Sequence, residues 1–498
     1  MNTRYTLLGL VVLIFLLCAS AFAIDRRGYY PEDWISYTNT RYVRSIAVGF
    51  YNVYFGTTQG ILQYDMNREQ WLDPITSSDG LPDDEINMIT VTDDGNRIHV
   101  NTPSGNYMYE TAFKEWYPSD LFPISEVRND LNQIGTFETY IAPFGFHIQQ
   151  PHVITGPELR EYPISTAVKS SQGDIWLGTW GLGPGLIESY GVEIDLLKFG
   201  LYTSDCRTMY LNDDRFYFGG RTNFRGENAL TIWNRADNSW KYIEARYDNS
   251  FISDQVNAIT SVDDNIFMAT DFGLVSMSPD GTVRKSYGSP GYFQTDLLLS
   301  LEHHGKYLFT GSDKGMYYLD LEGDSVEYMG GQLMANAAVL DIEYYKNDLW
   351  LGTDVGAVRY DFKTSRFYRY GSTGGVLLGF MIDIEADPSE GLWFAGEHHL
   401  VWMDDSFNER ERFSIDADLD GFSPNKLAVG ERFLWVATDY GMYRYDRLKH
   451  YWKHYLEDDG IIDNRVYDLL LDGDYLWIAT AGGVTRFYWN NPMRSKDY

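Results

Sequence analysis

Short stretches in which apolar and polar residues alternate recur along the chain, each bounded by a turn rich in glycine, asparagine or aspartate. Residues 466–471, for example, alternate in this way and lead into the turn Asp472-Gly473-Asp474. Alternation with a period of two predicts β-strands, and short Asp/Gly/Asn turns favour hairpins. No helical period competes with this pattern, so it predicts an all-β fold.

One sequence unit recurs about every 42 residues, the length of a four-stranded propeller blade. The unit is an apolar or aromatic triplet, then a small residue, usually Thr or Ser, two variable residues and Gly. It reads YFGTTQG where it ends at Gly60, and LWIATAGG where it ends at Gly483. The position after the triplet falls at residues 56, 101, 142, 178, 219, 269, 311, 352, 395, 437 and 479. These copies predict a β-propeller of about eleven four-stranded blades.

The two ends of the repeat region complement each other. The last repeat stops at Phe487, before a fourth strand, whereas residues 33–37 (DWISY) look like a fourth strand that precedes the first full repeat. Pairing them would cover strand edges that otherwise stay open. Because one ring usually holds four to eight blades, about eleven blades predict two rings. We expect a first set of blades in residues 24–240 and a second set in 241–498.

The first 23 residues have the pattern of a secretory signal peptide. Arg4 supplies the positive start, LLGLVVLIFLL over residues 7–17 is an apolar run, and AFA over 21–23 predicts cleavage after Ala23. Cys18 would suggest a lipoprotein, but Leu17 stands where a small residue is expected before a lipidated cysteine. No later stretch is long and apolar enough to cross a bilayer. We therefore expect a periplasmic or extracellular protein without a membrane span in the mature chain.

Composition narrows the function classes. Lys and Arg total 40 against 71 Asp and Glu, a net charge of -31, which argues against nucleic-acid binding. Aromatic residues make up 16% of the chain, enough to build a core, and two cysteines in 498 residues exclude a disulfide scaffold. The simplest interpretation of the negative charge is a solvated surface that keeps the protein soluble. The more specific alternative is that the charge attracts a cationic partner.

Two segments carry a family resemblance. Residues 79–86 (DGLPDDEI) and 459–466 (DGIIDNRV, running into LWIATAGGVTRF) resemble the two-component regulator propeller repeat. The resemblance extends over about residues 34–489, with degraded repeats from 101 to 235. It implies an extracytoplasmic sensing or binding module, often joined to a membrane span and a histidine kinase. This chain shows neither of these, so only the binding role is carried over.

Residues that break the repeat at its turns are the candidate ligand-binding residues. They are Trp180 in WGLGP, Arg221 and Arg225 in the insertion 221–227, and Glu397, His398 and His399. Residues 387–394 (DPSEGLWF), followed by Glu397, also resemble a blade of the streptogramin lyase propellers. That resemblance implies acid/base groups at the channel mouth with a divalent metal, and points to Glu397 and His398.

A calcium loop is a weaker candidate. Asp416, Asp418 and Asp420 match the start D-x-D-x-D-G of such a loop, but position 12 is Leu427 instead of a bidentate Glu. The segment also aligns with the turn that precedes a blade, which is the favoured interpretation. No cofactor, nucleophile motif or phosphate loop is predicted.

The sequence thus favours an exported, non-enzymatic propeller that recognises a glycan, peptide or protein partner. Two alternatives remain open. One is a propeller lyase or hydrolase with its chemistry near Glu397 and His398. The other is a structural subunit of a cell-surface or secretion assembly. The repeats describe the scaffold, and a scaffold does not determine function.

Overall fold

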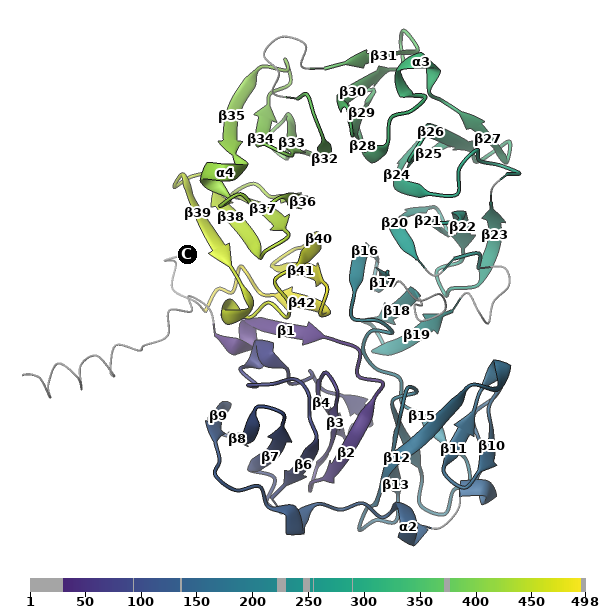
Figure 1. Cartoon of the computed structure of the whole chain (residues 1–498), viewed down its shortest axis with the longest axis vertical. Coiled ribbons are helices and arrows are strands. Elements are labelled where there is room, and N and C mark those ends of the chain that lie inside the picture. Colours follow the sequence, from purple (N-terminus) through teal and green to yellow (C-terminus); the bar gives the residue numbers. More distant parts are fainter. Residues whose placement is uncertain are drawn as a thin grey trace, which may run out of the picture.

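The structure, a computed structural model, describes residues 30–493 except 93, 135–136, 222–229, 245–250, 254, 289 and 371–376. Within these residues the strands form ten antiparallel sheets, nine with four strands and one with six. The helices are single turns: η1 (Pro31–Asp33), η2 (Ser77–Asp79), η3 (Ile124–Glu126), α2 (Leu131–Ile134), η4 (Phe137–Thr139), η5 (Pro157–Leu159), α3 (Gly331–Met334), α4 (Ile415–Asp418) and η6 (Glu457–Asp459). The all-β propeller prediction is confirmed (Figure 1).

Seven sheets form a closed ring, which we call the seven-blade ring (Figure 1). Its first four blades are β16 (Cys206–Asn212), β17 (Arg215–Gly220), β18 (Leu230–Asn234), β19 (Ser239–Ile243); β20 (Val256–Val262), β21 (Asn265–Thr270), β22 (Gly273–Met277), β23 (Val283–Tyr287); β24 (Leu298–His304), β25 (Tyr307–Ser312), β26 (Gly315–Asp320), β27 (Ser325–Tyr328); and β28 (Val339–Tyr345), β29 (Asp348–Thr353), β30 (Gly356–Asp361), β31 (Arg366–Arg369). The other three are β32 (Met381–Ala386), β33 (Leu392–Gly396), β34 (His399–Met403), β35 (Glu409–Ser414); β36 (Pro424–Val429), β37 (Phe433–Thr438), β38 (Met442–Asp446), β39 (Tyr451–Tyr455); and β40 (Val466–Asp472), β41 (Tyr475–Thr480), β42 (Val484–Phe487) with β1 (Trp34–Tyr37). The inner strand of each blade packs on the next, and β40 packs on β16 to complete the circle.

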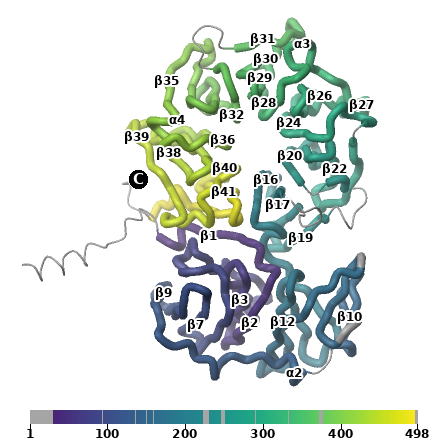
Figure 2. Tube along the Cα trace, viewed as in Figure 1, coloured from purple at the N-terminus to yellow at the C-terminus, as the bar shows by residue number. Residues whose placement is uncertain are grey.

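The N-terminal strand closes the ring, as the sequence predicts. β1 pairs antiparallel with β42, from Trp34 opposite Phe487 to Tyr37 opposite Val484. Figure 2 shows β1, in purple, lying beside the yellow C-terminal strands. The indole of Trp34 stacks on the Phe487 ring with centroids 3.8 Å apart, so residues from the two ends of the chain share one blade.

The other three sheets form an arc between β1 and β16, which we call the three-blade arc (Figure 1). Its strands are β2 (Val43–Val48), β3 (Asn52–Thr57), β4 (Gly60–Asp65), β5 (Gln70–Trp71); β6 (Met88–Val91), β7 (Arg97–Thr102), β8 (Gly105–Glu110), β9 (Glu115–Pro118); and β10 (His147–Gln150), β11 (Val153–Thr155), β12 (Glu161–Lys169), β13 (Ile175–Thr179), β14 (Pro184–Ile187), β15 (Asp195–Leu196). Inner strand β2 packs between β6 and β12. The blades therefore divide between β15 and β16, whereas the sequence suggested a division near residue 240.

The sequence unit occurs eleven times, but the described residues form ten sheets. The difference is the degraded copy around residue 142, which forms no sheet of its own. Strands β10 and β11 extend the third blade of the arc instead. Phe137, from the segment before that blade, and Ile154 of β11 are buried against Ile164 and Leu177. This segment covers an apolar face that a further blade would otherwise have to cover.

The repeated residues have packing roles. Thr438 Oγ1 donates a hydrogen bond of 2.8 Å to the Gly441 carbonyl oxygen, and Gly441 has a φ of 85°, which favours glycine. The small residue after the triplet lies under the neighbouring blade. At Gly352, an added Cβ would lie 3.0 Å from the carbonyl oxygen of Met381 in the next inner strand. The repeat thus specifies the turn between the second and third strands and the distance between blades.

Candidate functional site

A cavity of about 590 Å³ lies on the axis of the seven-blade ring. All seven inner strands contribute to its lining. In each inner strand the pairing register shifts near its start, and one residue then lies opposite the small residue of the second strand, as Asp341 lies opposite Gly352. The residues at this position line the cavity and are Thr208, Ala258, Ser300, Asp341, Asp383, Lys426 and Asp468.

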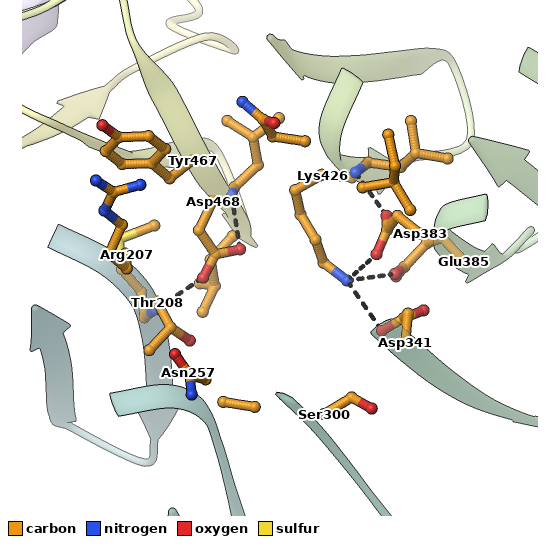
Figure 3. A pocket seen from close by; sticks show the side chains of 18 of the residues that line it. Arg207, Thr208, Asn257, Ser300, Asp341, Asp383, Glu385, Lys426, Tyr467 and Asp468 are labelled. Atoms are coloured by element: carbon orange, nitrogen blue, oxygen red, sulfur yellow. Dashed lines mark hydrogen bonds and ion pairs between the residues drawn. The ribbon is translucent and has the colours of Figure 1, made fainter. Parts of the chain in front are cut away.

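Lys426 lies among carboxylates from two neighbouring strands (Figure 3). Its Nζ is 2.5 Å from Asp383 Oδ1 and 3.9 Å from both Asp341 Oδ1 and Glu385 Oε2. Burial by itself would lower the pKa of Lys426, but the charges of Asp383, Asp341 and Glu385 raise it well above its ordinary value. The lysine therefore stays an ammonium ion.

Three aspartates also join neighbouring blades. Asp341 Oδ2 accepts a hydrogen bond of 2.9 Å from the Ile384 amide, and Asp383 Oδ2 accepts one of 2.7 Å from the Leu427 amide. Asp468 Oδ2 accepts one of 2.7 Å from the amide of Met209 in the first blade. In each case the carboxylate of one inner strand binds the backbone of the next. These side chains therefore fix the ring as well as shape the cavity.

Three successive inner strands carry a glutamate two residues after the position that lies opposite the small residue. Glu385 lines the cavity, and Glu302 and Glu343 hold the same strand position in β24 and β28. Burial, with the charge of Asp341, raises the pKa of Glu302 to about 7. Burial, with the charges of Glu385 and Glu302, raises that of Glu343 to about 9. These carboxyls hold protons near neutral pH because their charges are desolvated and close together.

Arg207 and Tyr467 line the end of the cavity at which the links between blades enter the inner strands, which we call the mouth. Here the Arg207 guanidinium lies 3.7 Å from the centroid of the Tyr467 ring and 2.7 Å from Asp205 Oδ1 (Figure 3). Turns between second and third strands end on this same side, since the strands of each blade run antiparallel. Five large apolar or aromatic residues in these turns and links are 39–47% exposed: Phe272, Tyr292, Leu378, Phe380 and Tyr440. We call these five the apolar rim.

The ligand-binding residues predicted from sequence lie on separate parts of the molecule. Trp180 is in the three-blade arc, and its ring centroid lies 5.2 Å from that of Tyr42. Arg221 follows β17, and its NH2 is 3.6 Å from Asp271 Oδ2. Arg225 lies outside the described residues. The structure thus places Trp180 and Arg221 on separate parts of the molecule.

Glu397 and His398 form the turn between β33 and β34, on the same side of the ring as the apolar rim, and His399 begins β34. Glu397 and His398 are exposed, and neither lines the cavity as the structure describes it. The Glu397 amide donates to the Phe380 carbonyl oxygen at 3.0 Å, which ties this turn to a residue of the apolar rim.

The calcium-loop candidate is a turn between β35 and β36. Asp418 Oδ2 accepts a hydrogen bond of 2.8 Å from the Ser414 amide, and Asp420 Oδ2 accepts one of 2.9 Å from the Tyr443 hydroxyl. Asp416 is exposed. Over the described parts of residues 30–493, no group of three or more His, Cys, Asp or Glu side chains is arranged to hold a metal ion.

The sequence analysis did not single out the carboxylates of the axial cavity, which we also call the channel. These residues lie in strands that alternate in the ordinary way. A signal was present: VLDIEYY and MIDIEAD, in successive repeats, both carry Asp-x-Glu at the same place. Only the strand register shows that Asp341 and Asp383 lie at the same level of one channel.

No family model matches the sequence, and no curated protein matches it. Solved structures do match. PorZ, an essential bacterial surface component of the type-IX secretion system of Porphyromonas gingivalis, is 12% identical with a TM-score of 0.51, and the match covers 90% of this chain and 68% of that one. This chain has a β-propeller fold.

Two further matches correspond to the two resemblances seen in the sequence. One is the extracellular domain of a protein described as a hybrid two component system of B. thetaiotaomicron, 14% identical with a TM-score of 0.46, covering 90% of this chain and 70% of that one. The other is a streptogramin B lyase, 12% identical with a TM-score of 0.46, covering 57% of this chain and 93% of that one. Identities this low show a shared fold alone.

Among the residues that the structure describes, no helix is long and apolar enough to cross a membrane. The predicted signal peptide, residues 1–23, lies outside those residues.

Proposed function

We propose that this protein is an exported, non-enzymatic propeller that binds a partner at the mouth of the seven-blade channel. The observation that carries the proposal is a cavity of about 590 Å³ on the axis of the seven-blade ring, with the apolar rim in the turns and links on the mouth side of the ring. Exposed apolar side chains grouped around a concave polar site are typical of a binding surface.

The chemistry of the channel favours binding over catalysis. Asp341, Asp383 and Asp468 each accept a backbone amide of the next blade, so their carboxylates serve to hold the ring together. Lys426 remains charged among them and is a poor base or nucleophile in that state. The alternative of a lyase or hydrolase rests on Glu397 and His398, which lie on an exposed turn outside the cavity lining.

Export rests on the predicted signal peptide with cleavage after Ala23. The name of PorZ, which describes a bacterial surface component, is consistent with a propeller working outside the cytoplasm. Mass spectrometry of the protein recovered from the producing cell should find a mature chain that begins at Ile24. A chain that retains residues 1–23 would contradict export by this route.

The binding site can be tested by crosslinking in the producing cell. A photo-crosslinkable amino acid is placed at Phe380 in the apolar rim, or at Phe50, an exposed residue of the arc that serves as the matched control. We expect one discrete adduct from Phe380 and none from Phe50. Identical adduct patterns at the two positions, or no adduct at Phe380, would refute the proposed site.

The same adduct separates the alternatives. A single protein partner in a one-to-one adduct is the outcome expected for a subunit of a surface assembly. A glycan or peptide adduct is the outcome expected for a sensing module. Turnover of a streptogramin that Glu397→Gln abolishes, with the fold intact, would overturn the non-enzymatic assignment.

A further inference from the structure

We infer that the channel mouth accepts a basic peptide segment, in which lysine or arginine is flanked by apolar side chains and the cation enters the channel. This inference rests on the proposed function, because it names the class of partner for that same surface. Three features of the described residues carry it: an excess of carboxylates in the channel, an ammonium ion already bound there, and the apolar rim.

The first feature is the charge of the channel. Six carboxyl groups stand at two successive levels of the inner strands: Glu302, Asp341, Glu343, Asp383, Glu385 and Asp468. Within 4 Å, the single lysine at these levels, Lys426, is paired with Asp341, Asp383 and Glu385. Over the described residues, the side chain of Glu343 has no hydrogen bond or ion pair. Burial and the charges of Glu385 and Glu302 keep this carboxyl group protonated near neutral pH, and a cation beside it would favour its ionised form.

The second feature shows which cation the channel can hold. Lys426 Nζ is held by carboxylates of β28 and β32 (Figure 3). A second ammonium or guanidinium that reached the next level of the channel would lie near Glu343 and Glu302, on β28 and β24, whose carboxyl groups hold protons near neutral pH. Opposite charge within about 4–6 Å lowers the pKa of a carboxyl group. Entry of the cation should therefore release protons.

The third feature is the apolar rim. The aromatic residues Phe272, Phe380 and Tyr440 are 41–47% exposed and lie on the side where the links between blades enter the inner strands. Aromatic rings contact apolar side chains and also attract a cation to their faces. Arg207 lies at the same mouth, but its positive charge is paired with Asp205. This pairing reduces its repulsion of an incoming cation. A basic and apolar segment matches both the rim and the channel.

Other partner classes fit less well. A net charge of -31 repels polyanions such as nucleic acid. A neutral glycan would stack on aromatic rings, but it would leave the carboxylates of the channel without a compensating charge. Charge complementarity therefore favours a basic peptide segment of a protein over these two.

The test uses the mature chain and three labelled peptides of one length. They are Gly-Phe-Lys-Phe-Lys-Gly, its counterpart with Glu in place of Lys, and its counterpart with Ser in place of Phe. Fluorescence anisotropy gives the affinity of each near neutral pH, at low and at high salt. We expect the Phe/Lys peptide to bind about tenfold more tightly than either counterpart, and to weaken as salt rises.

Two isosteric variants locate the effect. Glu343→Gln removes the carboxylate without changing side-chain size, and should weaken binding of the Phe/Lys peptide by about fivefold or more. Glu431→Gln, in the turn between β36 and β37 at the opposite end of the ring, should leave the affinity unchanged. Circular dichroism confirms that both variants fold. Calorimetry in buffers of different ionisation enthalpy should detect proton release, reduced in Glu343→Gln.

The inference is overturned if the Lys and Glu peptides bind equally, if the Phe and Ser peptides bind equally, or if Glu343→Gln and Glu431→Gln behave alike. The proposed function would survive any of these results provided that Phe380 still gives its crosslinked adduct. Loss of that adduct would instead remove the proposed function, whatever the peptides do.

Discussion

Closure of the ring by Trp34 gives a prediction that can be worked out from the structure. Its side chain is 1% exposed and stacks on Phe487 with an angle of 2° between the ring planes. A buried tryptophan covers about 200 Å², which at about 25 cal/mol per Å² corresponds to about 5 kcal/mol. Measured costs of replacing a buried Trp with Ala are about 3–5 kcal/mol. We therefore expect Trp34→Ala to lower the free energy of unfolding by about 3–5 kcal/mol.

Equilibrium unfolding in urea, followed by circular dichroism, measures this change. Trp180→Ala is the control, since Trp180 is 41% exposed and should cost about 1 kcal/mol or less. If Trp34→Ala costs no more than Trp180→Ala, the packing of β1 on β42 contributes little to the closed ring. The reasoning from burial and stacking would then be wrong.

Three further perturbations test the repeat and the channel. Gly311→Ala should destabilise the fold by about 1–3 kcal/mol, since its Cβ would lie 2.5 Å from the Val339 carbonyl oxygen. Gly288→Ala is the control and should not destabilise the fold, because no atom would lie closer than 3.8 Å to its Cβ. Equal melting temperatures of the two variants would contradict this prediction. Stability should fall by about 5 kcal/mol between pH 6 and pH 9, at about 1.4 kcal/mol per unit of pH for each proton retained, because folding raises the pKa of Glu302 to about 7 and of Glu343 to about 9. The folded protein therefore binds protons that the unfolded chain has already released. Glu343→Gln should reduce that fall in urea titrations at several pH values, and a stability that rises with pH would refute the assignment. Lys426→Met should cost about 3–5 kcal/mol at neutral pH. The cost should be smaller near pH 5, because burial raises the pKa of Asp341 to about 6 and of Glu385 to about 8, and these two carboxyl groups then hold protons. An equal cost at both pH values would refute the ion pairing.

The sequence predicted the blades well because the residues that repeat are the ones that pack. Gly441 is needed for the turn, and Gly352 lies under the next inner strand. The division of blades was harder to predict, because blades of the ring and of the arc are built from the same repeat. The longest interval, from residue 219 to 269, reflects a larger separation in sequence between β17 and β18 and between β19 and β20. Neither marks a change of unit.

The channel could not be predicted in the same way. Alternation tells which residues share a face of a strand, but it does not give the level that a residue reaches on the ring axis. Asp341 and Asp468 are far apart in sequence, and only the closed circle from β16 to β40 brings them to one cavity. Residues that depart from the repeat, such as Trp180, were therefore favoured over residues that obey it.

The three-blade arc is inserted in the sequence between β1, which closes the ring, and β16, which begins its first blade. The chain leaves the ring after Tyr37 and returns to it at Cys206. Tyr37 is 3% exposed, and its ring lies 5.0 Å from Trp233 and 6.1 Å from both Trp477 and Phe199. One apolar cluster joins these residues to the buried faces of the arc. The closing strand is thus held by β42 along its hydrogen-bonded edge and by the arc through its side chains. Three inserted blades that do not form a closed ring of their own can therefore strengthen the closure of the ring into which they are inserted.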